Sequence, residues 1–274
     1  MKAFLITGSS RGLGRSLAEA ALASGQQVVA AVRRPEAVAD LVERYPDTAL
    51  AVELDVTDAG AAERAVAAAV ERFGRLDVVV NNAGYANVSS IEDTSLEDFR
   101  AQVETNVWGA IHVSKAALPA LRAQGSGHIL QVSSVSGRLA PAPGLGAYVT
   151  AKFALEGFSE ALALEAAPFG VRVTIVQPGA VATTLASSMS LPEPSTPYRD
   201  VVAPMRNLYG SAPAGGLGAD PEKVAQSILA VLELADPPLR LALSGDAVDY
   251  IRDAGQRSLA ELDRWEALSR TVDA

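Results

Sequence analysis

The chain has 274 residues, with 49% hydrophobic and 20% charged side chains, which suits one large α/β domain or two small ones and excludes wholesale disorder. Its formal net charge of −9 argues against nucleic acid or an anionic membrane as a partner. The lack of cysteine and the presence of only two histidines exclude disulfides, thiolate catalysis and a Cys- or His-rich metal site.

The sequence offers no signal for a membrane or a secretory pathway. No apolar run reaches the length of about eighteen residues that marks a membrane helix. The apolar stretch that follows Lys2 is too short for a signal-peptide core. We therefore expect a cytoplasmic protein, and the absence of cysteine suits a reducing compartment.

The first predicted element is a short buried strand over residues 2–7, which runs into the glycine-rich turn TGSSRGLG. A helix follows, with Leu13, Leu17 and Ala21 at fourfold spacing, and Gly25 is placed to end it. Strand, glycine-rich turn and helix are the context that a dinucleotide-binding loop requires. The glycines let backbone N–H groups approach a pyrophosphate, and the helix N-terminus adds a favourable partial charge. We therefore predict a cofactor site at this turn.

The second predicted strand covers residues 28–32, and Arg33 and Arg34 follow it directly. In this architecture the end of the second strand faces the adenosine ribose, where a carboxylate favours a free 2′-hydroxyl. The chain has no carboxylate there, and Arg11 in the glycine loop is a second guanidinium within reach. Because an arginine fork suits phosphate geometry, we predict NADP rather than NAD.

The alternation of strands and helices continues to residue 176. We expect strands at 48–54, 76–80, 129–132 and 171–176, and helices at 59–73, 95–124 and 147–167. This rhythm predicts an α/β fold with a doubly wound parallel sheet (a Rossmann fold) in three α/β/α layers. Ligands of such sheets bind at the carboxyl ends of the strands, where Gly8, Arg33, Asp55, Asn82, Ser134 and Gly179 all fall.

After Gly179 the character of the sequence changes. Residues 185–220 hold five prolines and several apolar side chains, among them Leu185, Met205 and Tyr209. A segment of this length is typical of a functional lid or a disordered insert. A helix opened by Pro221, a strand at 238–243 and a helical extension at 246–271 complete the prediction. We expect one domain over residues 1–274.

Tyr148 and Lys152 lie one turn apart on the same face of the helix predicted at 147–167, and Ser134 precedes Tyr148 by fourteen residues. A phenol is a poor base at neutral pH, because its reference pKa is near 10. A nearby cation favours the phenolate, and a neighbouring hydroxyl can hold the substrate oxygen that exchanges the proton. The three side chains are therefore candidates for acid–base chemistry.

Seven motifs lie in order over about residues 2–185: TGSSRGLG, LDVTD, NNAG, TNVWG, QVSS, YVTAK and QPGAVAT. Together they resemble the short-chain dehydrogenase/reductase family in its NADP-preferring, single-domain branch. The resemblance implies that the pyrophosphate is cradled by Gly8, Ser10, Arg11, Gly12, Leu13 and Gly14. It implies that the adenine and ribose are lined by Asp55, Val56, Asn82, Ala83 and Gly84, and the nicotinamide by Pro178, Gly179, Val181 and Thr183.

The resemblance also implies the catalytic residues Ser134, Tyr148, Lys152 and Asn106. In that reading Tyr148 is the general acid or base, and Lys152 lowers the pKa of Tyr148 and bonds the nicotinamide ribose. Ser134 polarises the carbonyl group, and Asn106 anchors a water that links Lys152 to solvent. The spacing of fourteen residues between Ser134 and Tyr148 exceeds the commonest family spacing by one. We expect the extra residue to bulge out near Pro141, with Ser133 and Ser136 as less favoured substitutes for Ser134.

The expected activity is the interconversion of a ketone or aldehyde and an alcohol with NADP(H). The apolar lid residues favour a lipophilic substrate, and the long helices around residues 106 and 155 suggest a homodimer or homotetramer. Two other functions stay open: a redox sensor or scaffold that binds NADP without turnover, and a lyase or epimerase that retains its cofactor.

Overall fold

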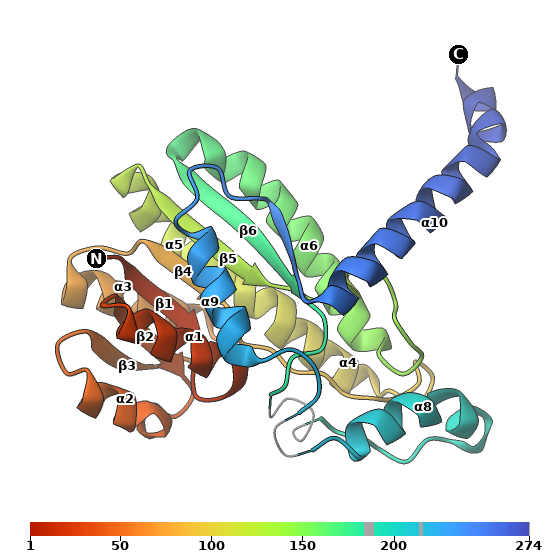
Figure 1. The fold of residues 1–274 in the computed structure, drawn as a ribbon, viewed down its shortest axis with the longest axis horizontal. Helices are drawn as coiled ribbons and strands as arrows, with labels where there is room; N and C mark the ends of the chain where they lie inside the picture. The colour runs from red at the N-terminus through yellow and green to blue at the C-terminus, as the bar shows by residue number, and fades with distance from the viewer. Residues whose placement is uncertain (184–188, 214–215, 274) are drawn as a thin grey trace.

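The computed structural model describes residues 1–183, 189–213 and 216–273. Parallel strands form one sheet in the order β3-β2-β1-β4-β5-β6-β7 (Figure 1). The strands are β1 (Ala3–Thr7), β2 (Gln27–Val32), β3 (Ala49–Glu53), β4 (Val78–Asn81), β5 (Gly127–Val132), β6 (Val171–Pro178) and β7 (Arg240–Leu243). The strand order reverses between β1 and β4, which makes that point the topological switch of a doubly wound sheet. The predicted fold class is confirmed.

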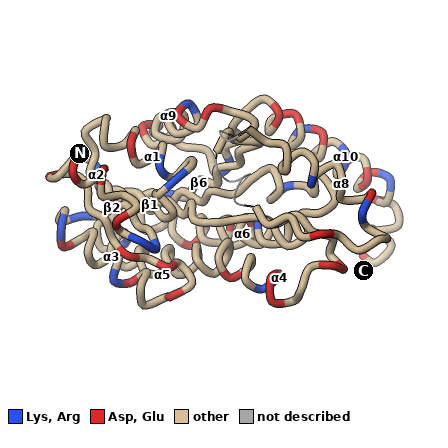
Figure 2. The backbone as a smooth tube through the Cα atoms, turned by 90° about the horizontal axis from the view of Figure 1, so that it is seen from below, with Lys and Arg blue, Asp and Glu red and all other residues tan. Residues whose placement is uncertain are grey.

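Helices cover both faces of the sheet, as the doubly wound fold requires (Figure 1). One face carries α1 (Gly12–Ala23), α2 (Ala39–Arg44) and α9 (Pro221–Val231), and the other carries α3 (Ala59–Phe73), α5 (Gly109–Gln124) and α6 (Gly146–Ala166). Consecutive strand residues point to opposite faces, so Phe4 and Ile6 pack in one core and Leu5 in the other. The central strands β1, β4 and β5 carry no charged residue, and the charges lie on the outer helices and loops (Figure 2).

Local signals fix several helix ends. The Asp58 carboxylate accepts a hydrogen bond from the N–H of Ala61 (3.1 Å), which caps the first turn of α3. Gly74 ends α3 in the left-handed region at φ 72°. Pro221 occupies the first turn of α9 behind the Asp220 cap. α3 thus covers the residues 59–73 that the sequence predicted, and α9 begins at the predicted Pro221.

The helix predicted over residues 95–124 is divided in the structure. It comprises α4 (Leu96–Val103), a π-helical turn (Glu104–Trp108) and α5. The side chain of Asn106 donates to the carbonyl oxygen of Gln102 (2.8 Å) and so competes with the backbone for that acceptor. A π turn inside a helix is frequent at functional sites, because it turns a side chain out of the regular helical row.

The predicted lid contains a helix that the sequence did not indicate. α8 (Arg199–Gly210) forms although Pro204 lies within it, and it follows a 3-10 turn over Thr196–Tyr198. Tertiary contacts hold it: Arg206 donates to the carbonyl oxygen of Leu191 (2.8 Å), and Val202 is buried beside Gly144. Leu185 and Gly215, which were also predicted in the lid, lie outside the described residues.

The chain ends in the long helix α10 (Gly245–Ser269), which leaves the body of the molecule and points away from it (Figure 1). Its existence agrees with the helical extension predicted at 246–271. Within the described part of the chain, no helix is both long and apolar enough to cross a bilayer.

Candidate active site

A cleft of about 560 Å³ lies at the carboxyl ends of the strands, a size typical of sites for small molecules and cofactors. It extends from the turn after β1 to the end of β6. Its walls include most of the residues that the sequence singled out: Gly8, Ser10, Arg11, Gly12, Leu13, Arg33, Asp55, Val56, Asn82, Ala83, Gly84, Asn106, Ser134, Tyr148, Lys152, Pro178, Gly179, Val181 and Thr183. The parallel sheet therefore gathers residues that lie far apart in the chain.

The glycine-rich turn between β1 and α1 forms one wall. Gly8 and Gly12 have φ angles of 67° and 57°, a region in which side chains with a Cβ are strained. Gly14 is the one predicted cradle residue that does not line the cleft. A Cβ there would come within 2.3 Å of the Asn82 amide nitrogen and 2.6 Å of the Gly8 carbonyl oxygen. Gly14 thus permits close packing of the turn rather than contact with a ligand.

Asn82 and Thr7 fix the ends of β1 and β4 against each other. The Asn82 side chain donates to the Thr7 carbonyl oxygen (2.9 Å), and the Thr7 hydroxyl accepts from the N–H groups of Asn82 and Ala83 (both 3.0 Å). These bonds hold the two loops that flank the switch point of the sheet. The floor of the cleft is therefore rigid before any ligand arrives.

The basic residues at the far end of the cleft come from two elements. Arg33 follows β2 and Arg11 belongs to the glycine-rich turn, and both line the cleft, whereas Arg34 does not. No carboxylate stands at the end of β2. The nearest acidic lining residue in the next strand connection is Asp55, whose carboxylate accepts from the N–H and hydroxyl of Thr57 (3.0 and 2.7 Å).

Ser134, Tyr148 and Lys152 meet at the other end of the cleft. Ser134 caps the turn after β5, and its side chain is near enough to the hydroxyl of half-buried Tyr148 to act on the pKa of that phenol. The Lys152 ammonium lies 5.6 Å from the centre of the Tyr148 ring and donates to the carbonyl oxygen of Val132 (2.8 Å). The extra residue between Ser134 and Tyr148 does not pull the serine away from the tyrosine.

Burial is the largest influence on the pKa values of Tyr148 and Lys152 at this end of the cleft. Desolvation raises the pKa of Tyr148 to about 12, an effect that the bond to Ser134 opposes and the nearby phenol of Tyr209 reinforces. Desolvation also lowers the pKa of Lys152 to about 8, against the pull of the Glu156 carboxylate. We expected the ammonium to lower the pKa of the phenol; instead desolvation is the largest influence on this pKa and raises it. At neutral pH Tyr148 carries its proton and Lys152 is mostly charged.

A buried polar network supports Lys152 from behind. Glu156, one turn further along α6, accepts from the side chains of Gln177 (2.9 Å) and Arg240 (3.1 Å). Arg240 also pairs with Glu160 (2.8 Å). The network ties α6 to the ends of β6 and β7, next to Pro178 and Gly179 in the cleft wall. It was absent from the sequence-based prediction, because its members come from three elements.

Asn106 lies at the π turn, where it is 2% exposed. Its amide nitrogen donates to the carbonyl oxygens of Tyr85 (3.0 Å) and Gln102 (2.8 Å), and its buried Oδ1 has no partner among the described residues. Such a buried acceptor, on a residue that lines the cleft, can accept from a water or a ligand. This geometry suits both a structural asparagine at a helix kink and an anchor for a water.

Several lining residues escaped the sequence-based prediction, namely Val32, Leu54, Thr57, Tyr85, Thr105 and Val132, and Ser133 was predicted only as a less favoured substitute for Ser134. Most are neighbours of predicted residues, so strand-end position was the signal that could have found them. Ser133 is buried with an unpartnered hydroxyl, and Ser136 donates its N–H to the Ser134 hydroxyl oxygen (3.1 Å). His112 lies apart from the cleft, with Nδ1 3.0 Å from the Val56 carbonyl oxygen. Within the described chain, no cluster of three or more acidic or histidine side chains could hold a metal ion.

The residues of the cleft fit a dinucleotide. Glycines with positive φ let the turn approach a pyrophosphate, α1 points its N-terminus at the cleft, and the unpartnered Asn106 Oδ1 and Ser133 hydroxyl provide buried polar contacts. Fold and site thus define a dinucleotide-binding protein of the doubly wound type.

Comparison with known proteins identifies the family to which the chain is similar. A profile of the family described as short chain dehydrogenase matches residues 2–193. "Oxidoreductase BOA17" of Botryotinia fuckeliana is 47% identical over 270 residues, which cover 98% of each chain. The solved structure of a short-chain dehydrogenase from Streptomyces avermitilis is 42% identical, with a TM-score of 0.92 over 99% of this chain and 98% of that one. A short-chain dehydrogenase/reductase from Burkholderia phymatum in complex with NAD shares the fold at 23% identity, with a TM-score of 0.80 over 92% of each chain.

The chain belongs to the short-chain dehydrogenase family, a family of oxidoreductases.

Proposed function

We propose that the protein is an NADP(H)-dependent oxidoreductase that interconverts a ketone or aldehyde and an alcohol. The observation that carries the proposal is the meeting of Ser134, Tyr148 and Lys152 in one cleft, with the Lys152 ammonium 5.6 Å from the centre of the Tyr148 ring. A bound nicotinamide cofactor would supply the hydride. The protein has to bind and orient the substrate and move one proton.

Tyr148 is suited to give that proton in the direction of reduction. Its raised pKa keeps the hydroxyl protonated near neutral pH, so it can donate to the substrate oxygen as negative charge develops there. The Ser134 hydroxyl, which lies near the same phenol, can turn to the substrate oxygen and hold it in place. In oxidation the same phenol oxygen accepts the proton.

Lys152 supports the proton transfer through its charge. Its ammonium lies beside the ring of Tyr148 and stabilises the phenolate left after the proton is given. Its ammonium donates to the Val132 carbonyl oxygen (2.8 Å), and Lys152 and Asn106 both line the cleft. The open Oδ1 of Asn106 supports a role in anchoring a water that returns a proton towards Lys152.

The preference for NADP rests on Arg33 and Arg11. Both guanidiniums line the cleft, and no carboxylate at the end of β2 competes for a ribose hydroxyl. The Burkholderia phymatum structure holds NAD, so the fold alone does not choose the cofactor. The two arginines are the residues of this chain that favour a 2′-phosphate.

A lipophilic substrate fits the side of the cleft nearest α8. Tyr209 of that helix is close enough to Tyr148 to raise the pKa of its phenol, so α8 lies over the reacting end. The backbone of Ser190 bonds to Val88 (3.0 Å), which joins the predicted lid to the loop after β4. Leu191 and Met205 bring apolar side chains to this region, as the sequence predicted.

A homodimer or homotetramer is supported by apolar side chains on the outer face of the long helices. Trp108, Phe153 and Leu164 are exposed by 48%, 46% and 76%. Residues of this kind on one surface are a common feature of subunit interfaces. A cytoplasmic location stays a proposal from the cysteine-free composition.

The function is tested with Tyr148→Phe, assayed with NADPH and a panel of ketones of increasing apolar size. We expect the parent chain to oxidise NADPH with at least one ketone, and the variant to lose about 10²–10⁴-fold in kcat while its Kd for NADPH stays within about twofold. Ser136→Ala, which removes a hydroxyl next to the site, serves as the matched control. Turnover that survives in Tyr148→Phe would contradict the proposal. Tight NADPH binding without turnover on any ketone or alcohol would favour a sensor.

A further inference from the structure

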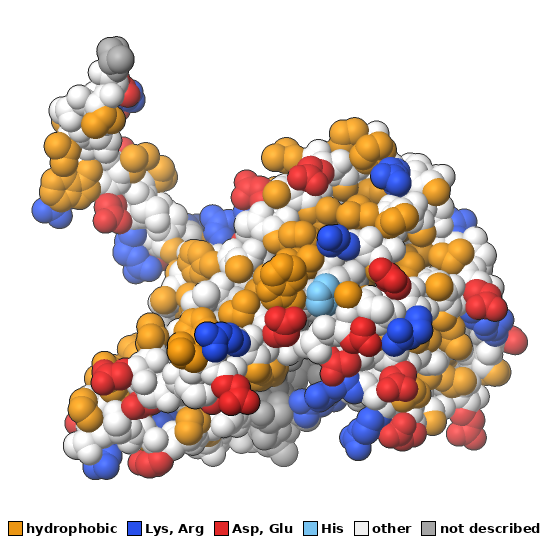
Figure 3. Space-filling view, turned by 180° about the vertical axis from the view of Figure 1, so that it is seen from behind, with side chains coloured by type: hydrophobic (Ala, Val, Ile, Leu, Met, Phe, Trp, Pro, Cys, Tyr) orange, Lys and Arg blue, Asp and Glu red, His pale blue; other side chains and the backbone are white. Residues whose placement is uncertain are grey.

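The outer part of α10 has no neighbour within its own chain. Every described residue from Gln256 onward is exposed, and this segment, residues 256–272, is called the arm below. Ala247, by contrast, is fully buried, and Ile251 and Ala254 are partly buried against the body. The arm therefore projects into solvent from a base that packs against the body mainly through Ala247 (Figures 1 and 3).

The arm carries an apolar stripe. Its large apolar residues are exposed by about half or more: Leu259 62%, Leu262 60%, Trp265 49%, Leu268 63% and Val272 85%. At 100° per residue they occupy one half of the helix circumference, on the side that Ala247 and Ile251 use to pack against the body. The space-filling view shows apolar side chains gathered along the arm (Figure 3). The stripe thus continues a packed surface beyond the edge of the molecule.

The α-helical part of the arm, residues 256–269, has about the length at which an isolated helix is only marginally stable in water. Helices of fewer than about 12–15 residues are marginal even with alanine-rich sequences, and most of their stability in proteins comes from the packing of an apolar face. Two intrahelical pairs, Arg257 with Asp253 (2.6 Å) and Arg270 with Glu266 (2.8 Å), contribute only a few tenths of a kcal/mol each. The arm needs a partner for its stripe.

The charges of the arm exclude two classes of partner. Residues 256–273 hold three arginines, no lysine and four acidic residues. A helix that binds an anionic membrane or nucleic acid carries an excess of basic residues on its polar face. A protein surface is the remaining kind of partner.

The arm is complementary to a second copy of itself. Glu261 and Arg264 take no part in the ion pairs described for α10, and the Arg264 guanidinium lies 5.3 Å from the centre of the Trp265 ring. In an antiparallel pair related by a twofold axis near residues 263 and 264, Leu262 faces Trp265 of the other copy, and Leu259 faces Leu268. The same register brings Glu261 of each copy within about one turn of Arg264 of the other, on the flank of the stripe.

From this juxtaposition we propose that two copies of this chain associate through their arms, as an antiparallel helix pair. The five apolar side chains of each arm expose roughly 500–600 Å², so pairing would bury about 1,000 Å² in total, near the lower bound of specific interfaces. The expected association is therefore of moderate strength and dependent on concentration. This pairing is separate from the outer face of Trp108, Phe153 and Leu164.

The first test measures assembly size by analytical ultracentrifugation of the full chain over a range of concentrations. Leu262→Glu places a charge in the middle of the stripe and should raise the arm Kd by about tenfold or more, equivalent to at least about 1.4 kcal/mol. At moderate concentration the variant should sediment with half the copies of the parent. Ala260→Glu adds the same charge on the polar side of the arm and should sediment like the parent.

Exchanging the charges at positions 261 and 264 tests whether the partner of the arm is a second copy of this chain. Glu261→Arg and Arg264→Glu should each weaken association, because like charges then face each other, and the double variant should restore it. A foreign partner would not be restored by exchanging both charges on the same arm. Circular dichroism and NADPH binding confirm that each variant folds, which is expected because the arm contacts nothing in the body.

Cross-linking locates the contact, since the chain has no cysteine of its own. Leu262→Cys should join two chains with a short bis-maleimide, whereas Ala260→Cys should not. An unchanged mass of Leu262→Glu at every concentration, no restoration in the double variant, or equal cross-linking of both cysteine variants would each overturn the proposal.

Discussion

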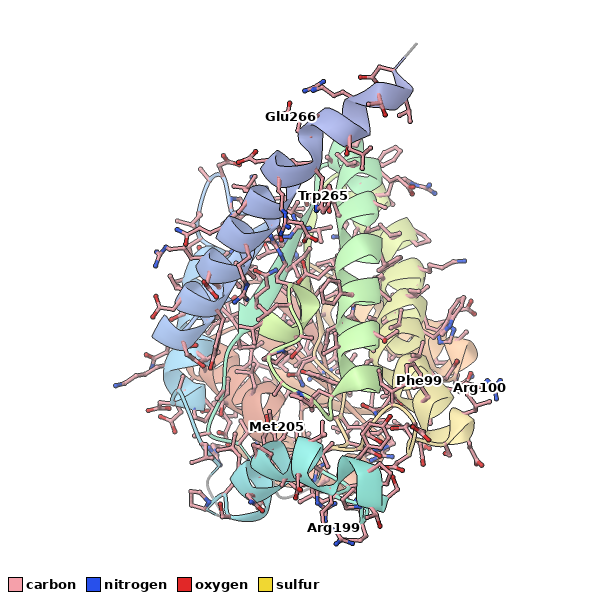
Figure 4. The ribbon with its side chains drawn as sticks, turned by 90° about the vertical axis from the view of Figure 1, so that its right-hand side faces the viewer. Phe99, Arg100, Arg199, Met205, Trp265 and Glu266 are labelled. Atoms are coloured by element: carbon pink, nitrogen blue, oxygen red, sulfur yellow. The ribbon has the colours of Figure 1, made fainter. Side chains whose placement is uncertain are left out.

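Charged side chains are buried beside the cleft, whereas on the arm both charged and apolar side chains are exposed to solvent. In the cleft, Lys152 and Glu156 are each 5% exposed, and hydrogen bonds from three elements hold them in place. On the arm, charged residues pair only with neighbours on the same helix, and apolar ones face solvent. Figure 4 shows the same contrast, with Trp265 and Glu266 on the free helix and the body side chains crowded between helices and sheet.

The difference shows where tertiary structure changes chemistry. Burial shifts the pKa values of Tyr148 and Lys152, because the sheet removes water from groups that would otherwise be solvated. The arm has no such environment, so its side chains keep ordinary properties until another surface covers them. Substitutions should therefore have large effects in the cleft and small ones on the arm, apart from assembly.

The largest effect is expected from the loss of the buried ammonium. Lys152→Met should lower kcat for carbonyl reduction by about 10²–10⁴-fold, because the phenolate left on Tyr148 loses its neighbouring charge. In the parent chain, kcat should fall as the pH rises above about 8, the pKa to which burial lowers Lys152. A pH–rate profile of both proteins measures this, and a flat profile of the parent up to pH 10 would contradict it.

A second buried group should control stability in acid. His128 is 6% exposed, its Nε2 donates to the Thr174 hydroxyl oxygen (2.9 Å), and burial lowers its pKa to about 4. The unfolded chain, with a pKa near 6.5, binds more protons, so about 3 kcal/mol of stability should be lost as the pH falls from 6.5 to 4.

His128→Gln should reduce the slope of unfolding free energy against pH in that window. Urea unfolding at several pH values measures the slope. Glu266→Gln on the arm is the control, because an exposed i, i+4 pair contributes about 0.5 kcal/mol or less. Equal slopes for the parent and His128→Gln would show that His128 is not responsible.

Cofactor choice is expected to shift by a smaller amount. Arg33→Ser removes a charge-assisted bond of about 1.5–3 kcal/mol, so the ratio of NADP to NAD affinity should fall by about 10–100-fold. Fluorescence titration with both reduced cofactors measures the ratio. Arg34→Ser, outside the cleft, should leave it unchanged, and an equal loss in both variants would point to general charge rather than a phosphate contact.

The smallest effect concerns turnover in an arm variant. Leu262→Glu should change kcat per subunit by less than about twofold, since surface substitutions away from a site are nearly neutral. A steady-state assay at a concentration where the variant has dissociated measures this. A large loss of kcat would show that association through the arm affects catalysis in the cleft. It would contradict the expectation that substitutions on the arm change assembly alone.

Much of this protein follows from local patterns in the sequence. Apolar runs such as Val78–Val80, glycine turns and helix caps specify strands, turns and helix ends through a few neighbouring residues, and α3 begins and ends where they predict. The alternation of strands and helices leaves few topologies, so the positions of Arg33, Asn82 and Ser134 at one edge of the sheet could be inferred.

Other features depend on residues that meet only after folding. The π turn at Asn106, the helix α8 around Pro204 and the packing role of Gly14 arise from contacts between distant segments. The Glu156, Gln177 and Arg240 network and the raised pKa of Tyr148 have the same origin. Sequence patterns report periodicity and neighbouring residues, whereas desolvation and long-range hydrogen bonds depend on which elements the finished fold brings together.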